Sequence, residues 1–370
     1  MRRVFALLVA CLLTTALARA QEWVAEYTKE FNAGIENLRA GKHDEGIANF
    51  KKCMELNPAP DNSAAYNIGC GHALKGEKDA AFEWLDKAAT WGFGNSDGLT
   101  GTSNVEHAKE DTDLASLHGD PRFDAFIAKM AKFRAELEAY ASVPEVYVPA
   151  AIKDLPEKPL LVVLHDVGST KSDVRERWKT IADELGTALL APSGKFPMGE
   201  TPAKGMSWFD DANRYTQSYW TYERTVHDAV TAFRKEHQLA KDRVFLVGEG
   251  QGGMVAFNVA IASAGLYKGA LVINGGIHAE LAQKKAANAG KLGFRARFVV
   301  QPDGIKGLPP DFSMNELLTE TESRLKTAGV TDVGTTILPT ADAAALRTAI
   351  LASLRSMEPK ATADAGGGER

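Results

Sequence analysis

Short apolar runs alternate with longer amphipathic stretches over residues 146–357. A run that is apolar throughout is typical of a strand buried on both faces, whereas an apolar residue at every third or fourth position is typical of a helix. The runs predict strands at residues 159–164, 188–191, 244–247, 270–274, 297–300 and 335–338, and the proline-rich stretch around residues 146–148 suggests a linker entering a strand. The amphipathic stretches predict helices at residues 172–185, 219–237, 254–261, 280–289, 315–328 and 343–356. This alternation indicates an α/β domain with a mostly parallel sheet and helices on both of its faces.

The stretch before residue 142 shows the helical pattern alone. It predicts helices at residues 31–40, 44–56, 63–74, 78–90 and 131–141. The first four form two pairs, with turns at Gly41 and Gly76. These glycines are 35 positions apart, close to the period of about 34 residues that is typical of tetratricopeptide repeats. An all-α domain is therefore expected to precede the α/β domain.

The two helix pairs have small residues where their helices meet and one large apolar residue that fills the groove between them. In the first pair these residues are Gly34, Gly46, Cys53 and Phe50, and in the second they are Gly69, Ala81, Ala88 and Leu85. The region resembles a pair of tetratricopeptide repeats, and Pro58 closes the first. It departs from the family at Glu30 and Asn37, where aromatic residues are usual, and the second repeat lacks its closing proline.

Two repeats are fewer than a stable stack requires. Residues 111–130 are expected to supply the missing surface through their apolar side chains, which are Leu114, Leu117, Phe123 and Phe126. The resemblance implies a concave face that binds a protein or peptide partner. The alternative is a structural appendage packed on the next domain, since no basic or aromatic stripe marks a ligand face.

The first 20 residues have the pattern of a secretory signal. Arg2 and Arg3 precede an apolar core at residues 4–13, and Ala18-Arg19-Ala20 matches a cleavage site. The core is too short to span a membrane, and no later apolar stretch is long enough. We therefore expect a periplasmic or secreted protein without a membrane span. Its helical domain should cover residues 21–141, its α/β domain residues 142–357, and a disordered tail residues 358–370.

Composition argues against nucleic acid as a partner. The formal net charge is −5, and the predicted signal contains three arginines and no acidic residue, so its removal gives −8. Such a chain lacks the basic excess that binds phosphate backbones. Cys53 and Cys70 would remain in an oxidising compartment, where a disulfide between them and two buried free thiols are both open. No cysteine–histidine cluster has zinc spacing, and we expect no metal or cofactor.

The most informative stretch is residues 242–258, DRVFLVGEGQGGMVAFN. A strand, a sharp glycine turn and a helix follow one another there, which is the layout of a nucleophile elbow with the pattern G-x-S-x-G. The turn reads Gly248-Glu249-Gly250-Gln251-Gly252, so glycine stands where the serine belongs. Gly250 has no side chain and can neither attack a carbonyl nor form an acyl-enzyme.

Two other interpretations of this turn compete. Gly248, Gly250 and Gly253 also fit the dinucleotide fingerprint G-x-G-x-x-G, which requires an acidic residue at the end of the next strand. That strand is predicted to end in Asn274. Alternatively, the glycines only let the strand and the helix pack closely.

Three matches together resemble an α/β-hydrolase of the phospholipase/carboxylesterase or dienelactone-hydrolase kind. They are LLVVLHDVG at residues 160–168, GMSWFD at residues 205–210, and the elbow with its Gln-Gly-Gly continuation. Asp166 stands where the family has a glycine in its oxyanion loop. The family's triad runs serine, acid and histidine along the chain. Asp303 is a displaced candidate for the acid, and no histidine follows His278.

The candidate pocket comprises the elbow and the segments that the resemblance places beside it, and no residue in it is assigned a catalytic role. Its members are Gly250, Gln251, Glu249, His165, Asp166, Trp208, His278 and Asp303. The amides of Gln251 and Asp166 are expected to converge on a carboxylate or phosphate. His165 is expected to be held by backbone bonds and Trp208 to lie in the core.

The sequence thus predicts a hydrolase-like protein without catalytic competence. It would bind a protein through its helical repeats or a small molecule in the candidate pocket. The alternatives are an unorthodox esterase and a nucleotide-binding enzyme.

Overall fold

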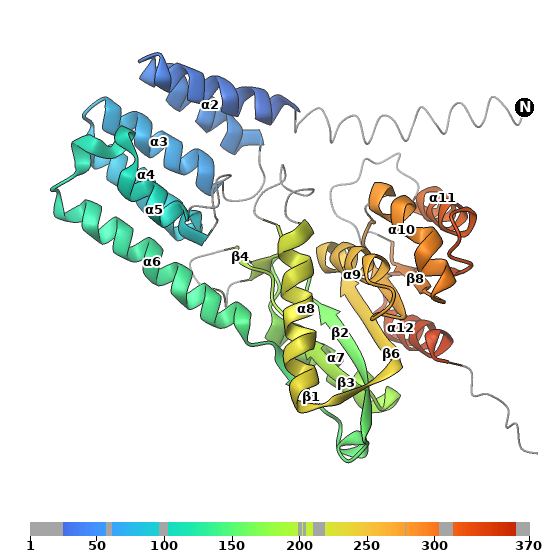
Figure 1. Ribbon diagram of the computed structural model, residues 1–370. Helices are drawn as coiled ribbons and strands as arrows, with labels where there is room; N and C mark the ends of the chain where they lie inside the picture. Colours follow the sequence, from blue (N-terminus) through green and yellow to red (C-terminus); the bar gives the residue numbers. More distant parts are fainter. Residues whose placement is uncertain are drawn as a thin grey trace, which may run out of the picture.

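The computed structural model describes residues 25–56, 61–95, 103–198, 202, 205–209, 219–277, 279–302 and 314–359. The predicted signal, the tail from residue 360, His278 and Asp303 lie outside them. Figure 1 shows two parts, a stack of helices and a sheet covered by helices, which the long helix α6 connects. No described helix combines the length and apolarity that a membrane crossing requires.

The first part is all-α. Its elements are a helix over residues 25–39, α2 (His43–Leu56), α3 (Asn62–Leu74), α4 (Lys78–Thr90), the short 3₁₀ helix η1 (Phe93–Asn95), α5 (Asn104–Glu110), the 3₁₀ helix η2 (Thr112–Leu117) and α6 (Pro121–Ser142). The four predicted helices that form two pairs are present. The sequence pattern missed α5, and the helix predicted at residues 131–141 is the second half of α6.

The predicted close approaches between paired helices are present. A Cβ atom at Gly34 would lie 2.7 Å from the Phe50 ring, and one at Gly69 would lie 2.8 Å from Leu85. Phe50 and Leu85 are both fully buried. Each large side chain therefore fills the space that the missing side chain of the facing glycine leaves open.

Two aspartates connect successive helix pairs. Asp61 caps α3 by accepting from Ala64 N–H, and its second oxygen accepts the Tyr27 hydroxyl at 2.6 Å. Asp111 caps η2 and accepts the Tyr66 hydroxyl at 2.7 Å. Each carboxylate thus satisfies a helix end and a phenol from the preceding pair, which fixes how the pairs stack.

The predicted capping segment closes this core. Leu114, Leu117, Phe123 and Phe126 are all buried in the same cluster as the two helix pairs. Ion pairs also attach α6 to α4, since Arg122 binds Asp79 and Lys129 binds Asp86.

The two cysteines are not bonded to each other. Cys53 and Cys70 are buried free thiols, near the Tyr27 carbonyl and the Asp111 carboxylate respectively. Burial raises the pKa of the Cys53 thiol to about 12 and that of Cys70 well above its usual value. Both therefore behave as small core side chains with little thiolate character.

The second part is an α/β domain with a seven-stranded sheet in the order β1-β3-β2-β6-β7-β8-β9. Only β1 runs antiparallel to its neighbour. The strands are β1 (Glu145–Tyr147), β2 (Glu157–Leu164), β3 (Ala188–Ala191), β6 (Gln238–Glu249), β7 (Gly269–Ile273), β8 (Arg295–Val300) and β9 (Asp332–Ile337). Short β4 (Phe196–Pro197) and β5 (Met206–Ser207) form a separate ribbon. The 3₁₀ helix η3 (Ala150–Ile152) follows β1.

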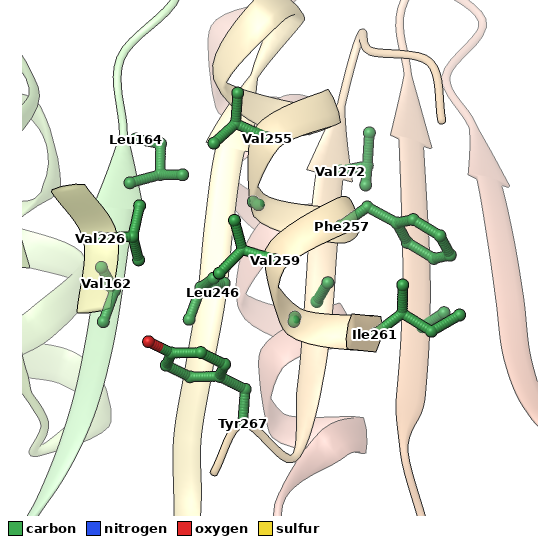
Figure 2. Close-up of a cluster of buried hydrophobic side chains, with 14 of the residues drawn as sticks. Val162, Leu164, Val226, Leu246, Val255, Phe257, Val259, Ile261, Tyr267 and Val272 are labelled. Atoms are coloured by element: carbon green, nitrogen blue, oxygen red, sulfur yellow. The ribbon is translucent and has the colours of Figure 1, made fainter. Parts of the chain in front are cut away.

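Helices cover both faces, as predicted. They are α7 (Lys171–Leu185), α8 (Tyr219–Glu236), α9 (Gly250–Ala262), α10 (Ala279–Lys291), α11 (Met314–Thr327) and α12 (Ala343–Met357). One buried cluster joins the sheet to α8, α9, α10 and α11, and another joins it to α7 and α12. Figure 2 shows Val255, Val259 and other apolar side chains of α9 lying against the strands beneath. The helix that carries the glycine elbow is therefore fixed within the main core.

Candidate functional site

The glycine elbow lies where β6 ends at Glu249 and α9 begins at Gly250. Gly250 has φ +51°, in the left-handed region that favours glycine. A Cβ atom at Gly248 would lie 2.3 Å from the Gly252 backbone, and one at Gly252 would lie 2.3 Å from the His165 carbonyl oxygen. The flanking glycines are therefore required for close packing of strand, helix and the loop after β2, as the alternative packing interpretation proposed.

The carboxylate of Asp166 occupies the place of the missing nucleophile. A Cβ atom built on Gly250 would lie 2.2 Å from Asp166 Oδ1 and 2.4 Å from its Cγ. No side chain at position 250 fits while Asp166 stays where it is. The sequence identified the glycine at the apex and the aspartate in the facing loop, but not that one fills the space left by the other.

The same carboxylate also accepts the hydrogen bond of the backbone amide that would stabilise an oxyanion in an active hydrolase. Gln251 N–H donates to Asp166 Oδ1 at 2.8 Å, and Val167 N–H donates to the same oxygen at 2.7 Å. The amide of the residue after the nucleophile is one of the two oxyanion donors in hydrolases of this layout. The expectation that the Gln251 amide is available to a ligand is therefore wrong, because a charged acceptor of the chain itself is already bound to it.

The Gln251 side chain also has a structural role. Its Oε1 accepts from Trp208 N–H at 2.7 Å and from the Ser207 hydroxyl at 3.1 Å. Trp208 is 1% exposed, and its indole N–H donates to the His165 carbonyl at 2.9 Å. The prediction that Trp208 is a core residue is confirmed, and Gln251 joins β5 to the elbow.

His165 is a buried histidine held by the backbone, as predicted. Its Nε2 accepts Gly194 N–H at 2.9 Å, so the ring proton lies on Nδ1 and is donated to the Asp166 carbonyl at 2.8 Å. Burial lowers the pKa of His165 to about 4. Both nitrogens are engaged, so this imidazole cannot act as a general base toward a ligand.

Acidification is expected to destabilise the α/β domain through His165. The unfolded imidazole has its ordinary pKa of 6.5 and the folded one a pKa of about 4, so only the unfolded state takes up a proton between these values. The free energy of unfolding should therefore fall as the pH drops through this window, by on the order of 2–3 kcal/mol. Urea unfolding at pH 7 and pH 4.5 measures the loss. His165→Gln should be less stable than the wild-type protein at pH 7, and its free energy of unfolding should fall less on acidification. An equal fall in both proteins would contradict the lowered pKa of His165 as the cause.

Glu249 points away from the apex. Its carboxylate binds Arg177 on α7 at 2.9 Å. Within the described residues, no group of three or more histidine, cysteine or acidic side chains is arranged to hold a metal ion.

The loop where the triad histidine belongs lies after β9. It reads Pro339-Thr340-Ala341-Asp342. Asp342 caps α12 by accepting from Ala345 N–H. This described loop therefore offers no imidazole to the elbow. His278 and Asp303, the other members of the candidate pocket, fall outside the described residues.

A hydroxyl–imidazole pair exists at the far end of α9. Ser263 Oγ lies 3.2 Å from His227 Nε2, and the Tyr267 hydroxyl lies 2.9 Å from His227 Nδ1. The nearest carboxylate, Glu223, lies 3.5 Å from Nε2, the nitrogen that also faces the serine. In a catalytic triad the acid binds the opposite nitrogen. Because Ser263 follows the last turn of α9, whereas Gly250 opens its first, the pair is separate from the elbow.

A family comparison supports this interpretation of the fold. The sequence model of the phospholipase/carboxylesterase family matches residues 148–295. This part of the chain belongs to the α/β-hydrolase superfamily. The match includes the Asp166 loop and the elbow of the α/β-hydrolase domain, and it stops before the loop that follows β9.

Solved structures with similar folds include two esterases. Esterase PE8 is 20% identical, with a TM-score of 0.43, and the match covers 58% of this chain and 98% of that one. A carboxylesterase from Mesorhizobium loti is 19% identical, with a TM-score of 0.42, and covers 56% of this chain and 93% of that one. An uncharacterised Bacillus cereus protein covers 88% of this chain at 15% identity and a TM-score of 0.41. These likenesses are too distant to bear on the activity of the α/β-hydrolase domain.

A curated relative matches over a shorter stretch. A chloroplastic protein of Arabidopsis thaliana is 22% identical over 111 residues, which is 30% of this chain. The chain matches only 30% of that protein's length.

Proposed function

We propose that this protein is an exported, non-catalytic member of the α/β-hydrolase superfamily that acts by binding a protein partner through its helical domain. One observation carries the non-catalytic part. The Asp166 carboxylate lies where a nucleophile side chain at position 250 would begin, and it accepts the Gln251 amide. The elbow therefore lacks its nucleophile and an available oxyanion donor together. Removing a triad member alone leaves a residual acceleration of roughly 10³–10⁴ over water, which depends on that donor.

The same contact disfavours a small-molecule ligand at the elbow. A carboxylate or phosphate at the start of α9 would need the Gln251 amide and would meet the Asp166 charge. The dinucleotide interpretation is disfavoured for the same reason, since the pyrophosphate belongs at this helix start. Asn274, where that fingerprint has an acid, instead exchanges two hydrogen bonds with Gln301.

The helical domain is the better candidate for binding. Its helix pairs pack through glycines facing large apolar residues, the arrangement by which tetratricopeptide-like pairs stack into an extended surface. Asp61 and Asp111 join successive pairs through a buried and a part-buried hydrogen bond to Tyr27 and Tyr66, and we propose that the partner binds on the outer helix faces.

Ester hydrolysis tests the non-catalytic proposal. We expect full-length protein, Gly250→Ser and the double variant Gly250→Ser/Asp166→Ala to hydrolyse p-nitrophenyl acetate no faster than heat-unfolded protein does. The double variant matters because it restores a hydroxyl and frees the amide but supplies no histidine. Turnover by the wild-type protein that saturates with substrate would refute the proposal.

The pair formed by Ser263 and His227 favours one second candidate, an unorthodox hydrolase. It predicts that a fluorophosphonate labels the wild-type protein and fails to label Ser263→Ala. We expect no labelling in either protein, because Glu223 is on the wrong nitrogen of His227 to orient it for proton transfer.

A further inference from the structure

A buried lysine joins the two domains. Lys171, the first residue of α7, is 6% exposed although it carries a charge. Its Nζ donates to the carbonyl oxygens of Tyr140 and Val143, each at 2.5 Å, and lies 3.9 Å from the centroid of the Tyr140 ring. Burial lowers the pKa of this amine. A buried charge persists only where such partners replace water.

The acceptors of Lys171 are the end of α6. The last carbonyls of a helix have no partner within it and carry its partial negative charge. Tyr140 belongs to the final turn of α6, and Val143 is its C-cap residue. The α/β-hydrolase domain thus supplies the cation that caps the last helix of the helical domain.

Neighbouring contacts hold the segment that follows α6. Ser172 donates to the Glu145 carboxylate at 3.1 Å, and Arg175 lies 3.7 Å from the same group. Both residues belong to the first part of α7. The beginning of α7 therefore holds the end of α6 and the start of β1 together.

The beginning of α7 is also fixed to the loop that fills the elbow. We call residues 166–169 the plug loop. It runs directly into Thr170, whose side chain forms a capping box with Asp173. Ser169 N–H donates to the Asp166 carbonyl, and Ser169 pairs with Met206 through Met206 N–H. The plug loop is therefore hydrogen-bonded from Ser169 back to the Asp166 carboxylate, and the backbone of Thr170 connects it to Lys171.

We propose that the end of α6 and the plug loop form one mechanical unit, in which Lys171 transmits the position of the helical domain to the contact between Asp166 and Gln251. A partner that shifts α6 would pull on α7 and loosen the carboxylate from the elbow amide. The inference rests on the proposed function for its partner, but the coupling belongs to the chain alone.

Hydrogen exchange in the intact protein tests the coupling without a partner. The amides of Val167 and Gln251 both donate to Asp166, so their exchange reports whether the plug is in place. Asp166→Ala should speed both and serves as the positive control. Lys171→Met should speed both by roughly tenfold, together with amides at the end of α6, while those of β7 stay slow. Lys179→Met, on the same helix but with its ammonium over the Tyr147 ring, should change neither.

Two outcomes would overturn the proposal. Faster exchange at the end of α6 with unchanged exchange at Val167 and Gln251 would show that Lys171 only caps a helix. Equal acceleration in β7 would show general destabilisation. Esterase activity would refute the proposed function and leave these exchange results intact, so the two failures are distinguishable.

Discussion

Gly252→Ala is expected to lower the free energy of unfolding of the α/β-hydrolase domain by at least about 4 kcal/mol, enough to prevent folding in a marginal protein. The added methyl would lie 2.3 Å from the His165 carbonyl oxygen and 2.5 Å from that of Leu164. Both atoms belong to the backbone where β2 ends, and β2 lies inside the sheet between β3 and β6. Relieving this steric clash therefore requires α9 to move away from the sheet, because rotating a side chain would not be enough.

The matched control is Gly265→Ala, in the turn after α9. An added Cβ there has no neighbour within 4 Å, and the residue does not have a positive φ. We expect a change within about 1 kcal/mol, of either sign. Denaturant unfolding followed by circular dichroism measures both variants. A Gly252→Ala protein as stable as Gly265→Ala would mean that the elbow does not hold α9 against β2 as closely as described.

Much of the fold could be predicted because its signals are local. The apolar run that became β3 gave the strand bounds residue for residue, and the helix bounds of α4 were equally direct. The strand before the elbow was predicted as four residues, but β6 begins at Gln238 because a polar, half-exposed extension pairs with the start of β2. Short α5 was missed for the opposite reason. Its seven residues are mostly polar, and its two buried side chains, Val105 and Ala108, make a weak periodic signal.

The candidate site, too, has features that could be predicted from the sequence and features that could not. Missing atoms can be read from a sequence, so the absent serine at Gly250 and the absent histidine between residues 339 and 342 were predictable. The direction in which a side chain points cannot be read from the sequence. The sequence predicts that the backbone amide of Asp166 converges with that of Gln251 on a ligand, whereas in the structure the Asp166 carboxylate is the group bound to Gln251. Two local signals did exist, an acid in place of the loop glycine and a glycine in place of the serine. The added side chain at the first position and the missing side chain at the second could have indicated that one fills the space of the other.

This complementarity explains why the elbow keeps its shape without a nucleophile. The amides of Val167, which is exposed, and Gln251, which is partly buried, both donate to the Asp166 carboxylate. This acceptor comes from within the chain, so the loop after β2 and the start of α9 remain joined whether or not a ligand is present. The contact is then a structural element, and its loss should be measurable as stability.

Gly250→Ser is accordingly expected to cost roughly 3 kcal/mol in the wild-type background and only about 1–2 kcal/mol in Asp166→Ala. The smaller figure is the cost of placing a side chain at φ +51°. The remainder is the displacement of Asp166, whose oxygen lies 2.2 Å from the new Cβ, and the loss of its bonds to two amides.

Gly168→Ser separates these two contributions. Gly168 also has a positive φ, +77°, but an added Cβ there has no neighbour within 4 Å. This variant should therefore cost about 1–2 kcal/mol and be insensitive to Asp166→Ala. A double-mutant cycle from urea unfolding of the single and double variants yields the coupling between positions 250 and 166, which we expect to be about 1–2 kcal/mol. Strictly additive costs would mean that Asp166 does not fill the apex in solution, and the elbow would again be open to a ligand.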